Sequence, residues 1–343
     1  MDRNYSIIPE LVYINWPFVY THANRKLAKS YSDAVCTEID NFLIVLGQRV
    51  DMQVLYFGGG AIDCLPEAII LDISGTLRKT FNFNNLLQGT IEVNLRFFDK
   101  SKIVVWQKLG INRLVIGIYH YMQPEIPIEH MRNFFSIIAL ACTICITPET
   151  IAHWKAYIKK VISWPIQQIS LSFIPTRHVQ LRIDFYYWLR EFLLSNGMYQ
   201  YELYGFEFPN HSSMYMKGYL QRKTLKGFGA YAESFDGVTR YRNEQRLLSY
   251  IEKVRSQKNS IVWSQTLSAQ DARLEKIMLG LRLANGVSLD SIYAGCSQKE
   301  RARLANQLLI LKEERLIIES ENAIALAPAG LVYEQEILLK LVI

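Results

Sequence analysis

The sequence contains no apolar run long enough to cross a bilayer, because its longest hydrophobic segment, Phe134–Ile146, includes Ser, Thr and Cys. It also has no dense block of one charge: 38 basic and 32 acidic residues are interspersed and leave a net charge of +6. The first residues, Met-Asp-Arg-Asn-Tyr-Ser, have neither the basic start nor the apolar stretch of a signal peptide. These absences predict a cytoplasmic protein without a membrane segment, and they argue against nucleic acid as a partner.

Cysteine is scarce, with five residues in 343. An odd number in a cytosolic chain argues against a disulfide framework. The pair Cys142-x-x-Cys145 has a spacing that suits metal or redox chemistry, but it lies in an expected buried strand. Residues three apart on a strand point to opposite faces, so we predict two small core residues there and no metal site.

The common catalytic templates are missing as well. The sequence has no Gly-x-Ser-x-Gly, no His-Glu-x-x-His and no Walker loop. The sequence therefore carries no motif that would indicate an α/β-hydrolase, a zinc peptidase or a P-loop nucleotide hydrolase.

What the chain does have is an alternation of short apolar runs with helical patterns. In residues 31–47, for example, Val35, Ile39, Phe42 and Leu43 fall on one face at helical spacing. Strands separated by helices indicate βαβ units with parallel pairing. The expected strands are Leu11–Asn15, Val54–Phe57, Thr90–Leu95, Arg113–Ile118, Ile137–Ile146 and Ile169–Phe173.

The pattern predicts two domains, residues 1–255 and residues 256–343, with the polar stretch 256–260 as the linker. In the second domain we expect helices at Asp271–Leu283 and Gln298–Glu314. Two short strands, Leu316–Glu319 and Ala323–Leu326, follow them. Helices followed by a hairpin predict a small winged-helix-like domain.

Two strand-and-loop segments resemble the first two motifs of the radical S-adenosylmethionine (SAM) enzymes. One runs Tyr-Ile-Asn-Trp-Pro-Phe from Tyr13, and the other is Val-Leu-Tyr-Phe-Gly-Gly-Gly, ending at Gly60. The branch most similar to the chain holds the oxygen-independent coproporphyrinogen III oxidases and the HemW-type heme chaperones. The resemblance covers nearly the whole chain and includes three more motifs: Leu109–Leu114, Gly227–Ala230, and Arg240 with Asn243.

This resemblance implies a partial (β/α)6 barrel with its site at the carboxyl ends of the strands. It also implies a lost cofactor, because the three positions that hold cluster cysteines in the family are Val19, Ala23 and Lys26 here. Valine and alanine cannot ligate iron, and a lysine ammonium repels it. We therefore expect no [4Fe–4S] cluster and no radical SAM activity.

Other departures fall where the family's chemistry lies. Arg96 is aligned with the glutamate of the family's Glu-x-Asn-Pro motif and replaces it in this chain. Ala141 likewise replaces an aspartate of another motif. Tyr119 and His120 stand among positions that are usually small or amide-bearing. We expect these two side chains to line the mouth of the barrel and to fill space there.

The resemblance carries a residual SAM-type pocket onto Tyr13, Gly58, Gly59, Gly60 and Arg113. The plain alternatives are a tight turn for the glycines and a salt bridge for the arginine. His22, inside the former cluster loop, is a candidate heme ligand, although a lone loop histidine is more often simply solvated. The aromatic segment between Tyr186 and Phe235 could hold a flat ligand or could simply be core.

Two classes of function follow and stay open at this stage. One is a protein that binds heme, another tetrapyrrole or a flat small molecule, or that binds an active enzyme partner as regulator or scaffold. The other is an enzyme refitted for non-radical chemistry, with SAM as a methyl donor or with no cofactor. No catalytic residue and no metal ligand can be assigned from the sequence.

Overall fold

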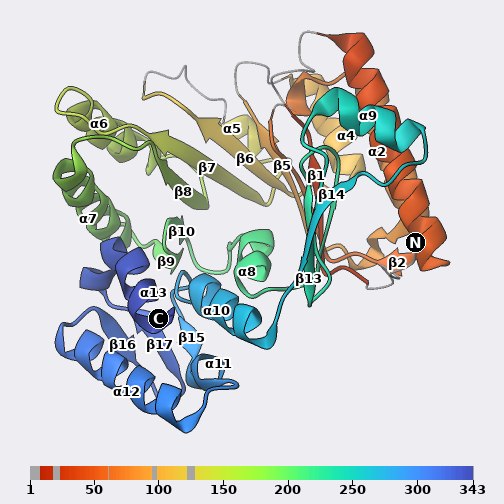
Figure 1. Ribbon diagram of the computed structural model, residues 1–343. Coiled ribbons are helices and arrows are strands. Elements are labelled where there is room, and N and C mark those ends of the chain that lie inside the picture. Colours follow the sequence, from red (N-terminus) through yellow and green to blue (C-terminus); the bar gives the residue numbers. More distant parts are fainter. Residues whose placement is uncertain (1–7, 18–23, 61, 95–98, 122–127, 343) are drawn as a thin grey trace. The chain divides into compact units, whose positions relative to one another are not determined.

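The computed structural model describes residues 8–17, 24–60, 62–94, 99–121 and 128–342 (Figure 1). The chain divides into two compact units. The first draws on residues 1–144, 159–172 and 223–266, and the second on residues 145–158, 173–222 and 267–343. Each unit is taken here by itself.

The first unit is built on one mixed sheet. Its central strands are β1 (Leu11–Asn15), β3 (Val54–Gly58), β5 (Gln88–Val93), β6 (Arg113–Ile118), β7 (Ile137–Ile144) and β8 (Gln168–Phe173). Neighbours from β1 to β7 pair in parallel, and β8 lies beside β7. All six residues of β6 are buried, as expected for a parallel strand covered on both faces.

On the other side of β1 the sheet continues through β11 (Leu225–Phe228), which is also parallel to β1. Three antiparallel strands complete it: β12 (Glu233–Phe235), β13 (Thr239–Asn243) and β14 (Ile261–Thr266). β14 therefore belongs to the first compact unit, whereas the expected boundary between the domains lies before it, after residue 255.

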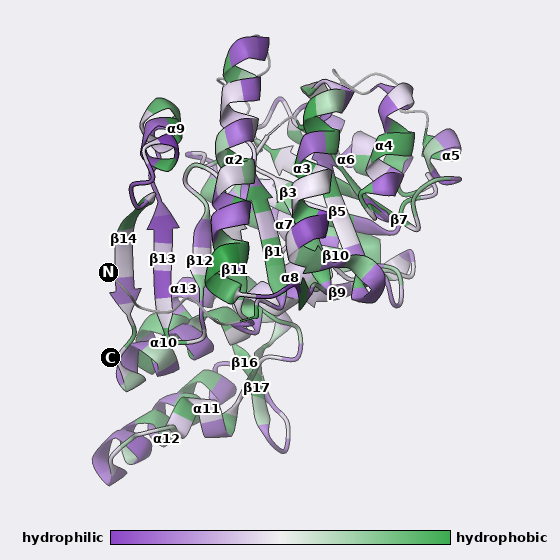
Figure 2. Cartoon of the chain, turned by 90° about the vertical axis from the view of Figure 1, so that its right-hand side faces the viewer, coloured by the Kyte–Doolittle hydropathy of each residue, from purple (hydrophilic) through white to green (hydrophobic). Residues whose placement is uncertain are grey.

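Helices cover the outer face of this sheet (Figure 2). They are α2 (Arg25–Leu46), α3 (Glu67–Thr80), α4 (Ile103–Lys108) and α9 (Leu247–Arg255), with the short α5 (Ile128–Met131) after β6. A small parallel pair, β2 (Val50–Asp51) and β4 (Phe81–Asn82), lies apart from the main sheet.

Local signals fix the ends of α2. Its start precedes the expected residue 31, because the Asn24 side chain accepts a hydrogen bond from the backbone N–H of Leu27 and caps the helix. Gly47 ends it in the left-handed region, at φ 68°, and donates its N–H to the carbonyl of Leu43. The buried face carries Tyr31, Val35 and other residues at helical spacing.

The second unit contains α6 (Ile151–Val161) in large part, then α7 (Val179–Ser195), the antiparallel pair β9 (Tyr199–Glu202) and β10 (Gly205–Glu207), and α8 (Met214–Leu220). Its carboxyl-terminal part consists of α10 (Ala269–Gly280), β15 (Val287–Ser288), α11 (Leu289–Tyr293), α12 (Gln298–Glu313), β16 (Ile317–Glu319), β17 (Ala323–Leu326) and α13 (Glu334–Val342). The expected hairpin is present, with β15 added as a third strand. Leu304, Ile324 and Ile337 are among the buried side chains of this part's own core.

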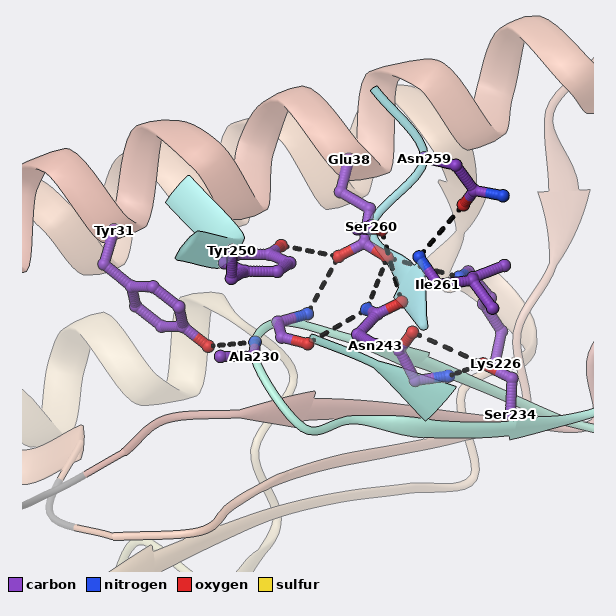
Figure 3. A network of polar contacts seen from close by, with 12 residues as sticks. Tyr31, Glu38, Lys226, Ala230, Ser234, Asn243, Tyr250, Asn259, Ser260 and Ile261 are labelled. Carbon is purple, nitrogen blue, oxygen red and sulfur yellow. Dashed lines mark hydrogen bonds and ion pairs between the residues drawn. The ribbon is translucent and has the colours of Figure 1, made fainter. Parts of the chain in front are cut away.

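A buried carboxylate on α2 anchors the turn that follows β11 (Figure 3). One oxygen of Glu38 accepts hydrogen bonds from the Tyr250 hydroxyl at 2.6 Å and from the Gly229 N–H at 2.9 Å. The other accepts from the Asn243 amide at 2.8 Å and lies 3.5 Å from the Lys226 ammonium. These contacts give the Gly227–Ala230 and Arg240–Asn243 motifs a structural role, because both converge on Glu38.

We expect Glu38→Ala to lower the free energy of unfolding by about 3–5 kcal/mol, because it leaves several buried donors without their acceptor. Asp33→Ala is the matched control on the same helix. Asp33 is half exposed and pairs with Lys29, so its loss should cost less than about 1 kcal/mol. Urea denaturation of both variants measures the difference, and equal midpoints would show that the Glu38 network is not a structural anchor.

Candidate functional site

The glycine segment after β3 forms a tight turn at the carboxyl end of the sheet. Gly59 adopts φ 86°, a conformation that favours glycine. A Cβ at this position would lie only 1.9 Å from the side-chain oxygen of Asn15. Gly59 therefore lets the backbone after β3 pack directly against the side chain of Asn15 at the end of β1.

Asn15, the last residue of β1, holds three segments together. Its side-chain oxygen accepts from the Tyr13 hydroxyl at 3.2 Å, and its amide donates to the carbonyl of Ala230 at 2.6 Å. Its backbone carbonyl accepts from the Tyr31 hydroxyl at 2.6 Å. The end of β1 is thus tied both to α2 and to the turn after β11.

Glu92 on β5 is the acidic group of the site. The Tyr56 hydroxyl donates to one carboxylate oxygen at 2.5 Å, and the Gly59 N–H donates to the other at 3.3 Å. Burial raises the pKa of Glu92 above the ordinary value of a glutamate, although these two hydrogen bonds and the Arg113 charge oppose the rise. Burial and the Glu92 charge also raise the pKa of Tyr56, which keeps its hydroxyl protonated and able to donate.

These groups border a cavity of about 460 Å³ at the carboxyl ends of β3, β5, β6 and β7. Its volume is within the range of small-molecule sites, about 300–1,000 Å³. Glu92 is the charged side chain among the described residues that line it. The lining is Gly59, Gly60, Glu92, Val93, Asn94, Val115, Gly117, Tyr119, Ala141 and Thr143.

Tyr119 narrows this cavity. Its ring packs over Gly117, where a Cβ would approach the ring to 2.8 Å. The side chain is 60% exposed, and burial together with the Glu92 and Asp63 charges raises the pKa of its hydroxyl. Tyr119 lines the cavity as the sequence predicted, whereas His120 stacks on Tyr121 at 4.3 Å and does not.

Sequence reasoning missed Glu92. It assigned the family's Glu-x-Asn motif to Arg96, which lies outside the described residues. Glu92-Val93-Asn94 has the same spacing, and both polar residues line the cavity. We therefore reassign the motif to Glu92 and Asn94. The available signal was an acidic side chain within an apolar strand on the same face as Thr90.

The other candidate residues fall into different places. Gly58 and Tyr13 adjoin the cavity, since a Cβ on Gly58 would lie 3.1 Å from both the Glu92 carboxylate and the Tyr13 ring. Arg113 begins β6, two residues before the level of Glu92, and hydrogen-bonds the buried Gln168 through Nε at 2.8 Å. Arg113 thus makes a hydrogen bond to a side-chain amide, whereas the alternative raised from the sequence was a salt bridge. The ligand-binding roles of these residues stay predictions.

The former cluster loop is mostly beyond the structural description. Val19, Ala23 and His22 lie outside the described residues, and Lys26 is exposed in the first turn of α2. Across the described ranges, no three His, Cys, Asp or Glu side chains come together as a metal site. Val19, Ala23 and Lys26 supply no thiolate, so these positions do not fit a [4Fe–4S] cluster.

The aromatic segment is divided between the two units. Tyr186 and Tyr204 lie in the second unit, while Phe228 and Phe235 are buried in the first. The Tyr186 hydroxyl donates to the carbonyl of Leu203 at 2.7 Å. Tyr186, Tyr201, Phe206, Phe228 and Phe235 are buried core residues, whereas Tyr199 and Tyr231 are exposed.

Comparison with known proteins agrees with the geometry. The family model described as the HemN C-terminal domain matches residues 267–333. The heme chaperone HemW of Bacillus subtilis is 21% identical over 95% of this chain and 97% of its own length. The solved structure of the Escherichia coli coproporphyrinogen III oxidase (HemN), described as a radical SAM enzyme, aligns with a TM-score of 0.80 at 18% identity. That alignment covers 98% of this chain and 91% of the other.

The chain is thus similar over most of its length to proteins of the HemN/HemW radical SAM family. The α/β fold and the HemN-type carboxyl-terminal domain predicted from the sequence are confirmed. In the part of the chain that the structure describes, no helix has the length and apolarity needed to span a membrane.

Gly59→Ala tests whether the turn needs glycine for space as well as for conformation. We expect it to cost more than about 2 kcal/mol of stability, because the left-handed backbone and the clash with Asn15 add together. Gly47→Ala shares the positive φ but meets no atom within 4 Å, and it should cost about 1–2 kcal/mol. Chemical denaturation of both variants gives the comparison, and equal losses would remove the packing argument.

Proposed function

We propose that this HemN/HemW family member performs no radical chemistry and acts by binding a small molecule in the cavity at the ends of β3, β5, β6 and β7. The observation that carries the proposal is Glu92, a partly buried carboxylate held by Tyr56 and Gly59 in a cavity whose other described lining residues are uncharged. Burial disfavours its charged form. A ligand with a positive group would restore that form, because opposite charges in a poorly hydrated site attract strongly.

SAM is the first ligand to test, because its sulfonium and ammonium groups are positive and the family resemblance places its pocket at Gly58–Gly60. The Gly59 turn lets a ligand approach the backbone closely. The loss of cluster cysteines removes the iron that would anchor SAM in the family. Glu92 would then be the principal charged contact, so affinity should depend on it.

We expect near-zero iron and sulfide after anaerobic reconstitution of the wild-type protein, because Val19, Ala23 and Lys26 offer no thiolates. The control is a triple variant, Val19→Cys, Ala23→Cys and Lys26→Cys, treated in parallel and expected to gain iron and a brown colour. Near-stoichiometric iron in the wild type would contradict the proposal.

Glu92→Gln should weaken SAM binding at least about tenfold, equivalent to about 1.4 kcal/mol, as measured by isothermal titration calorimetry. Wild-type affinity should fall as the pH is lowered through the raised pKa of Glu92, because protonation removes the negative charge. The variant should lack this pH dependence. Glu67→Gln, an exposed acid in the first turn of α3, is the control and should bind as the wild type does.

A refitted enzyme is the second candidate, since several polar groups do converge near Gly58–Gly60. If SAM binds and methyl transfer occurs, S-adenosylhomocysteine accumulates when cell extract is added. Binding without that product favours the non-catalytic role.

Heme is the alternative occupant, supported by the HemW relatives that are named heme chaperones. Protein purified from cells supplied with iron and a heme precursor would then show a Soret band that weakens in His22→Ala. A colourless protein that binds neither hemin nor SAM would instead favour a scaffold role with an active enzyme as partner.

A further inference from the structure

A second cavity lies on the opposite, helix-covered face of the first unit's sheet. Its volume is about 680 Å³, and it lies between the carboxyl-terminal half of α2 and the loop that joins α9 to β14. It shares no lining residue with the first cavity. The side chains that give it its character are Phe42, Ile44, Val45, Lys226, Tyr241 and Lys258.

Lys226 on β11 is a nearly buried cation at this site, with a side chain 12% exposed. Its ammonium lies 4.7 Å from the centre of the Phe228 ring and within 6 Å of the centres of two further rings, Phe42 and Tyr241. Aromatic faces attract a cation but accept no strong hydrogen bond from it. The ammonium therefore needs an oxygen partner elsewhere.

Glu38 meets this need only in part. Its oxygens already accept from Tyr250, Asn243 and Gly229 at 2.6–2.9 Å, whereas the Lys226 nitrogen is 3.5 Å away. An ammonium has three donor hydrogens, and this one long contact engages no more than one of them. Lys226 thus has hydrogen-bonding capacity left at the wall of the cavity.

A second lysine, Lys258, lines the cavity, and its backbone is held in place. The N–H of Lys258 donates to the carbonyl of Lys253 at 2.8 Å, and the N–H of Gln257 donates to that of Val254 at 3.0 Å. With Gln257 at φ 53°, this is a Schellman motif that ends α9 and sets the course of the loop. The lining residues thus include two lysines but only one carboxylate, Glu38, which is already engaged.

Part of the remaining wall is apolar, beside the polar residues Asn41, Gln257, Asn259 and Ser260. Ile44 and Val45 at the end of α2 are 76% and 49% exposed, and Phe42 and Val254 continue the surface inward. A ligand that matches both features carries an anionic head for Lys226 and a hydrophobic body for the α2 side.

We propose that this cavity binds a small organic carboxylate with an apolar body, with Lys226 as the carboxylate contact and Phe42, Ile44 and Val45 as the apolar wall. The site shares no lining residue with the cavity that holds Glu92. The test of carboxylate binding in this cavity and the test of SAM binding in the other can therefore be judged separately.

The test uses 4-phenylbutyrate as the probe and 4-phenylbutyramide as its neutral counterpart, each titrated into the full-length protein and followed by NMR. We expect the carboxylate to bind at least about tenfold more tightly than the amide, because only the anion can pair with Lys226. Lys226→Met keeps the length of the side chain among the aromatic rings and should abolish that preference.

Two controls keep the result interpretable. Glu67→Gln should leave 4-phenylbutyrate binding unchanged, because Glu67 is exposed and lines neither cavity. Ile44→Asp, at an exposed position, should weaken binding without unfolding the chain, which circular dichroism checks. Equal binding of acid and amide, unchanged selectivity in Lys226→Met, or no binding of either probe up to its solubility limit would each overturn the proposal.

Discussion

The candidate site depends on a carboxylate that lies outside it. Glu38 on α2 holds the Gly229 N–H, and the next residue, Ala230, accepts the amide of Asn15 and donates its own N–H to Tyr31. Asn15 in turn fits against Gly59, whose N–H donates to Glu92. Because each contact sets the position of the next, a buried ion on the outer face of the sheet positions the cavity on the inner face.

The sequence was sufficient to predict most of the fold because its signals are local. Leu11–Asn15 and Arg113–Ile118 are continuous apolar or mixed runs that match β1 and β6 in both ends. The predicted start of α2 was wrong, and a local contact explains the difference: α2 starts earlier than expected because Asn24 caps it. The parallel order of the strands followed from the alternation with helices.

The site was less predictable, because its key contacts join residues far apart in the chain. Tyr56 and Glu92 come from different strands, 36 residues apart, and nothing in either segment alone shows that they share a hydrogen bond. Gly58–Gly60 could be found because glycine clusters are visible in a sequence. Arg113 could be predicted as the first residue of its strand, but only the strand register shows that it lies two residues before the level of Glu92. The prediction that the chain holds no cluster rests on the residue types at positions 19, 23 and 26.

The alternation of side chains along β1 and β11 explains how one sheet can serve two cavities of opposite charge. Tyr13 pairs in register with Gly227 and faces the barrel interior, beside Tyr56, whose hydroxyl bonds Glu92. Its neighbour Val12 pairs with Lys226, which points to the α2 side. Because adjacent residues point to opposite faces, a carboxylate can face one cavity and an ammonium the other, with the sheet between them. The sheet thereby keeps the two charges apart, which is the arrangement that the proposed cationic ligand of one cavity and the proposed anionic ligand of the other require.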